Sequence, residues 1–444
     1  MGRTYRYRKQ RQKLANEHEQ IKDERFLPDL YKYLSSLGWR NKSQLTARNF
    51  AATGRGLCSK SLTLEIGSEL INLPSDALLS IKTLENDEDF KELFDESKFD
   101  KDHKISFQAL MAFYILFQKV LGDNSKFLAY LKSLPSFFTT PYFCPIAELQ
   151  CLPENILEKT VEQNRLIKLA YNNLKTVIKI TDFEVQYPLQ QFRWSYFVVN
   201  TRSVYVFGKQ LKSEKSFFQT LITEDCNLAL APFLDLFNHS DQVTTQADLI
   251  RNSQTKELEF ILTLESCENS KIPPLQQIFI SYGALTNLKL LSEYGFFLPS
   301  NRHDYFEFSL NDIENFLHTE KTLKGRVFHK NKFKFIREHN LCDQMFVHCV
   351  EGISHNLHVV LHLLFKEESY FPNILNQVAF GSVENLQNVN EDVKLLLKFK
   401  LNEYEIFIKS LESIKTLSKS GTVAKSYLQE CHKYLNDCIV TIAC

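Results

Sequence analysis

Two segments of this 444-residue chain decide its fold: LALAPFLDLFNHS, from Leu228 to Ser240, and ISYGALTNLKLLSEYGF, from Ile280 to Phe296. A third and shorter segment, GRGL at 54–57, precedes both of them. Each residue of these segments, taken singly, has an ordinary structural interpretation, so the functional information lies in their order and spacing. Glycine is scarce in the chain, at 13 residues, yet these segments contain Gly54, Gly56, Gly283 and Gly295.

The composition is that of a soluble globular protein, with 44% hydrophobic residues, 24% charged residues and 36 phenylalanines. It excludes the collagen-like, low-complexity and disordered classes, and the length predicts two or three domains. None of the 10 cysteines forms a CxxC pair, which argues against zinc-ribbon and thioredoxin chemistry. No signal peptide or long apolar run is present, so we expect no membrane partner and a reducing compartment, nucleus and cytoplasm.

Formal charges balance at 53 basic and 53 acidic residues, but residues 1–13 carry six Lys or Arg and no acid. Such a run can serve as a nuclear import signal or contact nucleic-acid phosphates, and it can equally be a solvated tail. Direct nucleic-acid binding is therefore expected only through residues 1–13, if at all.

The texture along the chain predicts an α+β protein. Strands are expected across 53–74 and again across 196–283, in YFVVNTRSVYVF, ELEFILTLE and QIFISYG. Helical patterns dominate 105–175 and the chain beyond 303. An α+β core interrupted by a helical insert fits this order better than alternating βαβ units. We predict three regions: a basic tail and N-terminal helix (1–46), a strand-rich core (47–283, insert about 84–195) and a helical region (284–444).

Three patterns that suggest ligand sites fail on inspection. FDKDHKISF at 99–107 lacks the glycine and the bidentate glutamate of a calcium loop. His355, His358 and His362 share one helix face, but apolar neighbours favour structural histidines over a metal site. GRG at 54–56 lacks the third glycine of a dinucleotide-binding loop. No metal is expected.

Together, GRGL, VNTRSVY at 199–205, the APFLDLFNHS run and the YG segment resemble the SET-domain protein methyltransferases. Within that family they resemble the subgroup whose core is split by a helical insert, to which the plant Rubisco large-subunit methyltransferase belongs. The basic GRTYRYRKQRQK start is similar as well, although the resemblance is specific only in the core. It implies a β-rich SET core with pseudoknot-like threading, followed by an all-helical C-terminal domain.

The resemblance implies methyl transfer from S-adenosyl-L-methionine to a lysine of a protein substrate, a histone tail or another protein. The lysine amine must be neutral to attack, and deprotonating an ordinary lysine at pH 7 costs about 4.6 kcal/mol. An apolar and aromatic channel lowers the lysine pKa by desolvation, so catalysis consists mainly of positioning. Tyr282 matches the catalytic tyrosine that orients the amine, and Tyr294 matches a second aromatic of the same region.

The cofactor site is implied by the same resemblance. Asn238 and His239 match the pair that holds the two ends of the cofactor, and Phe296 falls where an aromatic packs on adenine. Arg202 falls where an arginine meets the cofactor carboxylate. Gly54 and Gly56 are expected to let the backbone approach the methionine portion. The implied set of cofactor-binding residues is Gly54, Gly56, Arg202, Asp235, Asn238, His239, Tyr282 and Phe296.

Some positions depart from the family pattern. Cys58 stands where some relatives have an arginine that contacts the cofactor. Lys82 stands near the position where relatives often have an acidic residue for the cofactor amine. Both departures put those cofactor contacts in doubt. Val204 occupies a position where the actin-histidine enzyme of this family has asparagine, which weakens a histidine-substrate interpretation. No cysteine occurs between Cys267 and Cys342, so no zinc is expected and the helical tail should close the site.

Three alternatives remain open at this point: a methyltransferase for a non-lysine side chain, a catalytically idle SET-like interaction module, and a nucleic-acid-binding protein working through its basic tail. An idle module predicts the loss of the tyrosine or of the NHS segment, and both are intact. Binding through the basic tail predicts a strongly salt-dependent affinity that disappears when residues 1–13 are removed.

Overall fold

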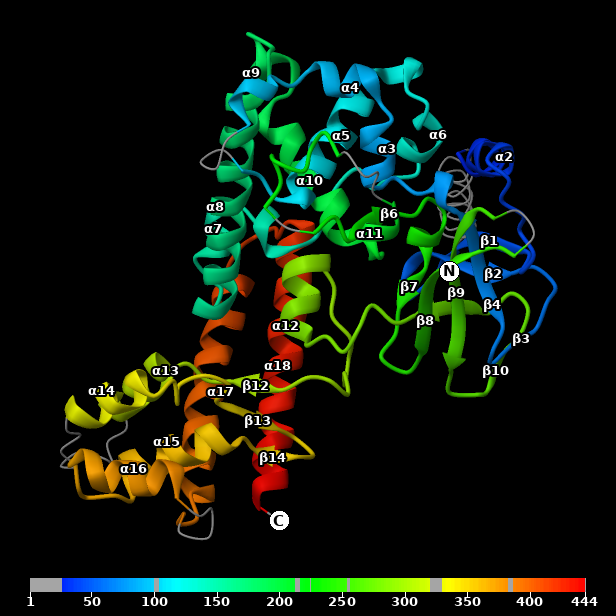
Figure 1. Cartoon of the computed structure of the whole chain (residues 1–444). Helices are drawn as coiled ribbons and strands as arrows, with labels where there is room; N and C mark the ends of the chain where they lie inside the picture. Colours follow the sequence, from blue (N-terminus) through cyan, green and yellow to red (C-terminus); the bar gives the residue numbers. More distant parts are fainter. Residues whose placement is uncertain are drawn as a thin grey trace, which may run out of the picture. The chain divides into compact units, whose positions relative to one another are not determined.

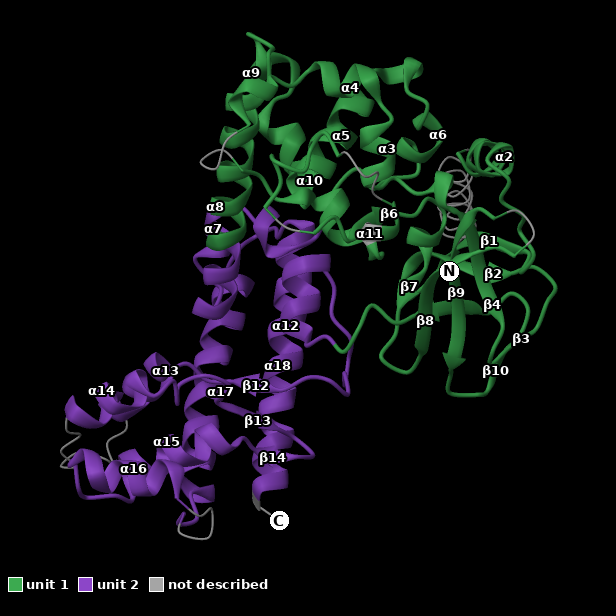
Figure 2. Ribbon diagram, viewed as in Figure 1, with its two compact units in different colours: residues 1–138, 161–284 green, residues 139–160, 285–444 purple. Residues whose placement is uncertain are grey.

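The computed structural model describes residues 26–99, 104–211, 216–223, 225–253, 256–319, 330–381 and 386–443 (Figure 1). The basic run at 1–13 lies outside these residues. The chain divides into two compact units, coloured separately in Figure 2. Unit 1 consists of Met1–Phe138 and Val161–Ala284, and unit 2 consists of Thr139–Thr160 and Leu285–Cys444.

A four-stranded sheet in unit 1 joins the segments that decide the fold. Its strand order is β1 (Leu45–Phe50), β2 (Gly54–Ser59), β11 (Gln277–Ile280), β7 (Asn238–His239). β11 runs antiparallel to β2 and parallel to β7, with Phe279 opposite Asn238. The end of the first segment therefore lies beside the start of the second, although strands β8 to β10 intervene in the chain.

Three smaller sheets complete the strands of unit 1. β9 shows the predicted alternation, since Phe260, Leu262 and Leu264 are buried at every second position. The predicted strands across 53–74 and in ELEFILTLE and QIFISYG are therefore present. The sheets are β4 (Glu69–Pro74)–β9 (Leu258–Ser266)–β8 (Thr244–Arg251), β3 (Leu64–Glu65)–β10 (Lys271–Ile272) and β5 (Ser203–Tyr205)–β6 (Leu228–Leu230).

A helical insert separates β4 from β5, as the sequence predicts. Its central helix, α5 (Phe107–Val120), begins where the Ser106 hydroxyl accepts the Ala109 N–H at 3.1 Å, and it is buried almost all round. The uniformly apolar FQALMAFYILF pattern explains this, because a helix without a polar face must lie inside a core. The other insert helices are α3 (Ile81–Glu85), α4 (Glu88–Glu92), α6 (Leu128–Leu131), α7 (Ile146–Leu149), α8 (Glu154–Val177), α9 (Phe183–Gln186) and α10 (Leu189–Arg202).

The structure corrects one strand prediction. Most of YFVVNTRSVYVF belongs to helix α10, and only Ser203–Tyr205 forms a strand. Phe197, Val198 and Val199 are all fully buried or nearly so, and a short apolar run buried on every side has no period that separates strand from helix. The helical insert consequently extends to Arg202 rather than to about 195.

Unit 2 is built mainly of helices, so the predicted helical C-terminal region is present. It also contains a three-stranded sheet, β12 (Phe306–Glu307)–β13 (Phe346–His348)–β14 (Gly352–Ile353), which the expectation of an all-helical domain did not include. Strands of two or three residues are too short to show an alternating pattern. Its helices after 284 are α12 (Asn287–Lys289), α13 (Leu310–Thr319), α14 (Lys330–Glu338), α15 (His355–Phe365), α16 (Pro372–Phe380), α17 (Asn390–Glu412) and α18 (Lys419–Ala443).

The remaining helices of unit 1 are short. α2 (Leu27–Ser36) ends before Gly38, whose φ of 93° marks the predicted helix stop, and α11 (Gly208–Leu211) follows β5. The overall architecture is thus α+β, with a strand-rich core split by helices, as predicted.

Candidate functional site

The parallel pairing of β7 with β11 brings His239 and Tyr282 together. The Tyr282 backbone N–H donates to His239 Nδ1 at 3.1 Å, and the two rings stack with centroids 5.0 Å apart at 19°. Nδ1 also lies 3.3 Å from the Ile280 carbonyl oxygen, so two backbone groups of the second segment meet this edge of the imidazole ring. The Tyr282 hydroxyl donates to the Phe237 carbonyl oxygen at 2.6 Å, which fixes the ring at both ends.

The side chain of Asn238 is hydrogen-bonded to strand β2 of the same sheet. Its Nδ2 donates to the Arg55 carbonyl oxygen at 3.0 Å, so the orientation of the amide is fixed by β2. Among the described residues nothing donates to its Oδ1, and the residue is half-buried. The amide oxygen is therefore an acceptor without a donor among the described residues.

The two positions of GRGL that carry glycine require it for different local reasons. Gly54 has φ of +71°, in the left-handed region that glycine tolerates best. Gly56 has an ordinary φ, but a Cβ there would lie 2.6 Å from Gln277 Nε2 and 3.0 Å from Asn238 Nδ2. Gly56 thus makes room for two side chains of the site, a role beyond the predicted close approach to a cofactor.

The LDL turn that precedes Asn238 is built on a strained residue. Phe233 has φ of 75°, rare for a residue with a side chain, and its ring is fully buried. Tyr31 and Trp39 pack against that ring with centroid distances of 5.0 and 5.1 Å. This packing holds the turn from which Asp235 projects into the core.

Arg202 and Asp235 form a buried ion pair. Arg202 Nη1 donates to Asp235 Oδ2 at 3.0 Å and to the Asp235 carbonyl oxygen at 2.9 Å, and Tyr130 donates its hydroxyl to the same Oδ2 at 3.0 Å. Burial is the largest influence on the pKa of the Arg202 guanidinium and lowers it, but the charge of Asp235, its hydrogen bond and smaller contributions from Tyr130 and Tyr282 together give a net upward shift. Arg202 Nε and Asp235 Oδ1 are buried and have no hydrogen-bond partner among the described residues.

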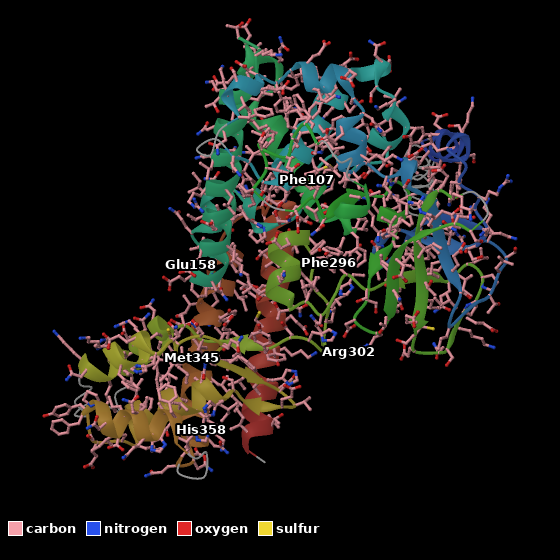
Figure 3. The ribbon with its side chains drawn as sticks, in the orientation of Figure 1. Phe107, Glu158, Phe296, Arg302, Met345 and His358 are labelled. Atoms are coloured by element: carbon pink, nitrogen blue, oxygen red, sulfur yellow. The ribbon has the colours of Figure 1, made fainter. Side chains whose placement is uncertain are left out.

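Tyr294 and Phe296 belong to unit 2, and Phe296 is labelled in Figure 3. Tyr294 ends a π-helical turn, η6 (Leu290–Tyr294), and its ring meets that of Phe296 edge-on at 6.2 Å. Between them, Gly295 has φ of +80° and its carbonyl oxygen accepts the Thr139 hydroxyl at 2.7 Å. Burial raises the pKa of the Tyr294 hydroxyl, with a smaller contribution from Glu293.

Two of the departures from the family pattern, Cys58 and Lys82, have plain structural roles. Cys58 is fully buried in β2 and its Sγ approaches the Thr46 carbonyl oxygen at 3.8 Å. Lys82 forms a 2.6 Å ion pair with Asp76 on the surface. Neither contacts a predicted site residue through an interaction that the structure records.

Sequence reasoning missed Tyr130, Arg55 and Gln277. Tyr130 lies in the apolar stretch KFLAYLKSL, which signals a core helix and nothing more. Arg55 and Gln277 are neighbours of predicted residues in the chain or in the sheet, and the strand pairing of GRGL with QIFI was the signal that could have found them.

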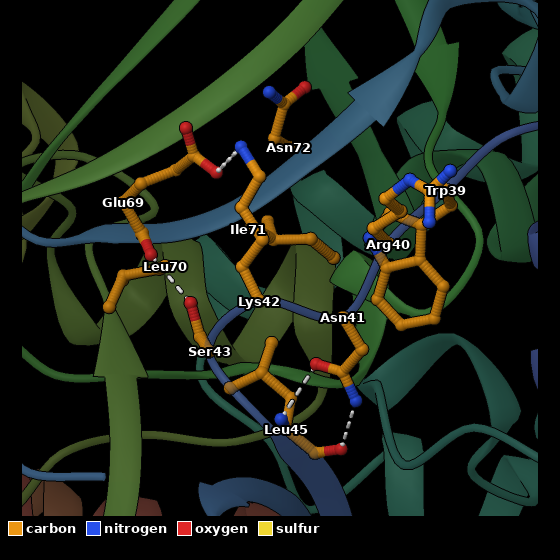
Figure 4. A pocket seen from close by; sticks show the side chains of 10 residues that line it. All are labelled: Trp39, Arg40, Asn41, Lys42, Ser43, Leu45, Glu69, Leu70, Ile71 and Asn72. Atoms are coloured by element: carbon orange, nitrogen blue, oxygen red, sulfur yellow. Dashed lines mark hydrogen bonds and ion pairs between the residues drawn. The ribbon is translucent and has the colours of Figure 1, made fainter.

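A shallow hollow on unit 1 is not this site. It lies open to solvent between the turn after α2 and strand β4, and Lys42 and Glu69 form a 3.4 Å ion pair across it (Figure 4). None of the predicted site residues lines it.

Two of the three histidines of α15, His358 and His362, have protein partners. His358 Nε2 lies 2.9 Å from the Gln387 carbonyl oxygen, and His362 Nδ1 accepts the Gln387 N–H at 3.2 Å. Burial lowers the pKa of His362. Within the described part of the chain, no group of His, Cys, Asp and Glu side chains is arranged to hold a metal ion. No described helix is long and apolar enough to span a bilayer.

Comparison with known structures decides the fold. The SET domain of LSMT, in a structure bound to lysine and AdoHcy, superposes with a TM-score of 0.59 at 17% identity, covering 94% of this chain and 91% of that one. The chain has the SET fold. No family model matches it.

Sequence relatives of this SET-fold chain carry related names. SET domain-containing protein 4 of Artemia parthenogenetica is 28% identical over 287 residues, covering 65% of this chain and 66% of that protein. The mouse protein of the same name is 28% identical over 405 residues, covering 89% and 84%. The ribosomal lysine N-methyltransferase set11 of Schizosaccharomyces pombe (28%, 45% of this chain and 46% of that protein) and the mouse actin-histidine N-methyltransferase (25%, 65% and 45%) also match.

Proposed function

We propose that this protein is an S-adenosyl-L-methionine-dependent protein methyltransferase that modifies lysine. The single observation that carries the proposal is the β7–β11 pairing, which stacks the Tyr282 ring on His239 and places Asn238 beside them. The SET fold and relatives named as lysine and histidine methyltransferases support it.

The polar groups of unit 1 fit such a cofactor. S-adenosyl-L-methionine has an ammonium and a carboxylate, and it supplies an electrophilic methyl group on a sulfonium. Asn238 Oδ1 and Asp235 Oδ1 accept no hydrogen bond from described residues, and Arg202 Nε donates none. These groups supply both the acceptors and the cationic donor that the amino-acid portion needs. His239 supplies an imidazole ring for its adenine end, and Phe296 stays the aromatic that the family resemblance implies for adenine.

Tyr282 is proposed to orient the lysine amine. Its hydroxyl proton is engaged by the Phe237 carbonyl, so the hydroxyl oxygen presents lone pairs to an amine N–H. The amine must be neutral, at a cost of about 4.6 kcal/mol for an ordinary lysine at pH 7. Desolvation between aromatic side chains offsets part of that cost, and orientation for attack supplies most of the remaining rate enhancement. Tyr294, in unit 2, stays the second aromatic that the family resemblance implies.

Lysine is favoured over histidine as the substrate side chain. Val204, half-buried in β5, has no amide with which to bind an imidazole ring. A methyltransferase for a non-lysine side chain is the second candidate, supported by the match to the actin-histidine enzyme. A catalytically idle interaction module is the third, and the intact Tyr282 and Asn238 argue against it.

We further propose histone and non-histone lysines as targets and the nucleus and cytoplasm as the site of action. The basic run at 1–13 supports nuclear import, and any direct nucleic-acid contact would use the same run. No zinc or membrane partner is proposed.

Radiolabelled methyl transfer tests the function. The full-length chain is incubated with labelled S-adenosyl-L-methionine and a nuclear or cytosolic extract, and mass spectrometry identifies the modified residue. Methyl-lysine supports the proposal and methyl-histidine supports the second candidate. No label in any protein, while Tyr282→Phe behaves identically, would support the idle module.

A further inference from the structure

We propose that Tyr130, on the short helix α6 of the insert, is a positioning residue of the site in unit 1 and acts through Asp235. The inference rests on the proposed function, because it assigns Tyr130 a part in holding the groups that bind the cofactor. Tyr130 lies outside every motif that identifies the fold, and its hydroxyl meets a carboxylate 105 residues away.

The first link is the carboxylate itself. Tyr130 is fully buried, and its hydroxyl donates to Asp235 Oδ2 at 3.0 Å. Arg202 Nη1 donates to the same oxygen at 3.0 Å, so both donors meet on Oδ2. Oδ1 of the same buried carboxylate receives no hydrogen bond from a described residue. Two donors on one oxygen fix the rotation of the carboxylate, and the free oxygen is left with a defined direction.

A second series of hydrogen bonds connects Tyr130 to Asn238. Ser133 donates its hydroxyl to the Tyr130 carbonyl oxygen at 2.7 Å, and Arg55 Nη2 donates to the Ser133 carbonyl oxygen at 2.7 Å. Arg55 in turn accepts the Asn238 amide at 3.0 Å on its own carbonyl oxygen. Residues 130–133 of the insert are thus hydrogen-bonded, directly or through Arg55, to Asp235 and Asn238 of one segment.

The pKa of the Tyr130 hydroxyl favours its role as a hydrogen-bond donor. Burial raises the pKa of its hydroxyl well above the ordinary value, and the Asp235 charge adds to the rise. The hydroxyl therefore keeps its proton at neutral pH and acts as a donor to Asp235.

The insert contains a matched control for this interaction. Tyr114, on α5, is also fully buried, and its hydroxyl donates to Asp87 Oδ2 at 2.7 Å. Asp87 contacts no predicted site residue in the structure. Tyr114→Phe and Tyr130→Phe therefore remove the same group from the same kind of partner, one away from the site and one within it.

The test is calorimetric binding of S-adenosylhomocysteine to the full-length wild type, Tyr130→Phe, Tyr114→Phe, Asp235→Asn and the Tyr130→Phe/Asp235→Asn double variant. We expect Tyr130→Phe to weaken binding at least fivefold and Tyr114→Phe to leave it within twofold. In the Asp235→Asn background, Tyr130→Phe should change affinity by less than twofold, because its action passes through that carboxylate.

The outcomes separate this inference from the proposed function. If the wild type binds no S-adenosylhomocysteine, the proposed function fails and this inference fails with it. If the wild type binds and Tyr130→Phe binds equally well, or loses as much affinity in the Asp235→Asn background, only the positioning role is overturned. Should Tyr130→Phe unfold, Ser133→Ala replaces it: a loss of more than twofold supports the network, and unchanged affinity overturns it.

Discussion

The backbone N–H of Tyr282 donates to Nδ1 of His239 across 3.1 Å, although 43 residues separate the two in the chain. This bond holds the imidazole ring and the backbone of the tyrosine in a single contact. It exists because β7 and β11 pair in parallel, so strand ends that carry these residues reach the same edge. The geometry of the predicted catalytic tyrosine therefore depends on the NHS segment as well as on its own strand.

Removing the Tyr282 hydroxyl should separate catalysis from binding. In Tyr282→Phe the ring still stacks on His239, but the oxygen that faces the amine is lost. We expect methyl transfer to fall about 100-fold, the scale on which small losses of alignment act, while S-adenosylhomocysteine affinity stays within twofold. Steady-state transfer on a verified substrate and calorimetry measure the two quantities. Unchanged turnover would remove Tyr282 from its assigned role.

Asn238→Ala should weaken cofactor binding. The substitution removes an acceptor held by the Arg55 carbonyl, and losing one hydrogen bond to a charged group costs about 1.5–3 kcal/mol, roughly 10- to 100-fold in affinity. Asn72→Ala is the control, because Asn72 bonds Glu259 at 2.9 Å and contacts no predicted site residue. Calorimetry with S-adenosylhomocysteine should show the loss only in the first variant. Equal affinities would count against the site.

The sequence predicts this site where a motif is local and misses it where contacts are distant. Asn238, His239 and Tyr282 stand in short characteristic segments that the sequence shows directly. Tyr130 has no such signal, since an aromatic in an apolar helix is ordinarily a core residue and its partner Asp235 lies far along the chain. Only the fold brings those two side chains together.

The failure at α10 has a related cause. Val198 and Val199 favour strands by propensity, but both are fully buried in a helix, where tertiary packing outweighs intrinsic preference. The same limitation hides the reason for Gly56. Its neighbours Gln277 and Asn238 come from other strands, so the space that a Cβ would occupy is invisible in the sequence.

Unit 2 should carry a pH-dependent stability term from Asp304. Burial raises the pKa of this carboxyl from 3.8 to about 6, against the opposing hydrogen bonds from Asn287. The native state thus binds a proton that the unfolded state has released between about pH 4 and pH 6. The stabilisation is complete below pH 4 and is lost as pH rises through 6, a change of about 3 kcal/mol at most.

Urea denaturation of the wild type and Asp304→Asn across pH 4–7 measures this term. The difference in unfolding free energy between the two should shift against the wild type as pH rises from 4 to 6, because the amide does not titrate. Taking the difference cancels the other carboxyl groups, which titrate in both proteins. A difference that is constant with pH would contradict the raised pKa.

Gly295, between Tyr294 and Phe296, should tolerate no side chain. A Cβ there would lie 2.6 Å from Thr139 Oγ1 and 2.8 Å from both the Thr139 carbonyl carbon and the Thr140 nitrogen. Gly352 is a matched control in the same unit: its φ of +84° is close to the +80° of Gly295, but nothing lies within 4 Å of its Cβ position.

Gly352→Ala should therefore lower the free energy of unfolding only by the left-handed backbone penalty, about 1–2 kcal/mol. Gly295→Ala should cost at least about 2 kcal/mol more, because backbone atoms of Thr139 and Thr140 must move rather than a flexible side chain. Urea denaturation of the two variants measures the difference. Equal losses would show that the 139–140 segment yields easily, and that the turn carrying the two aromatics is not held by it.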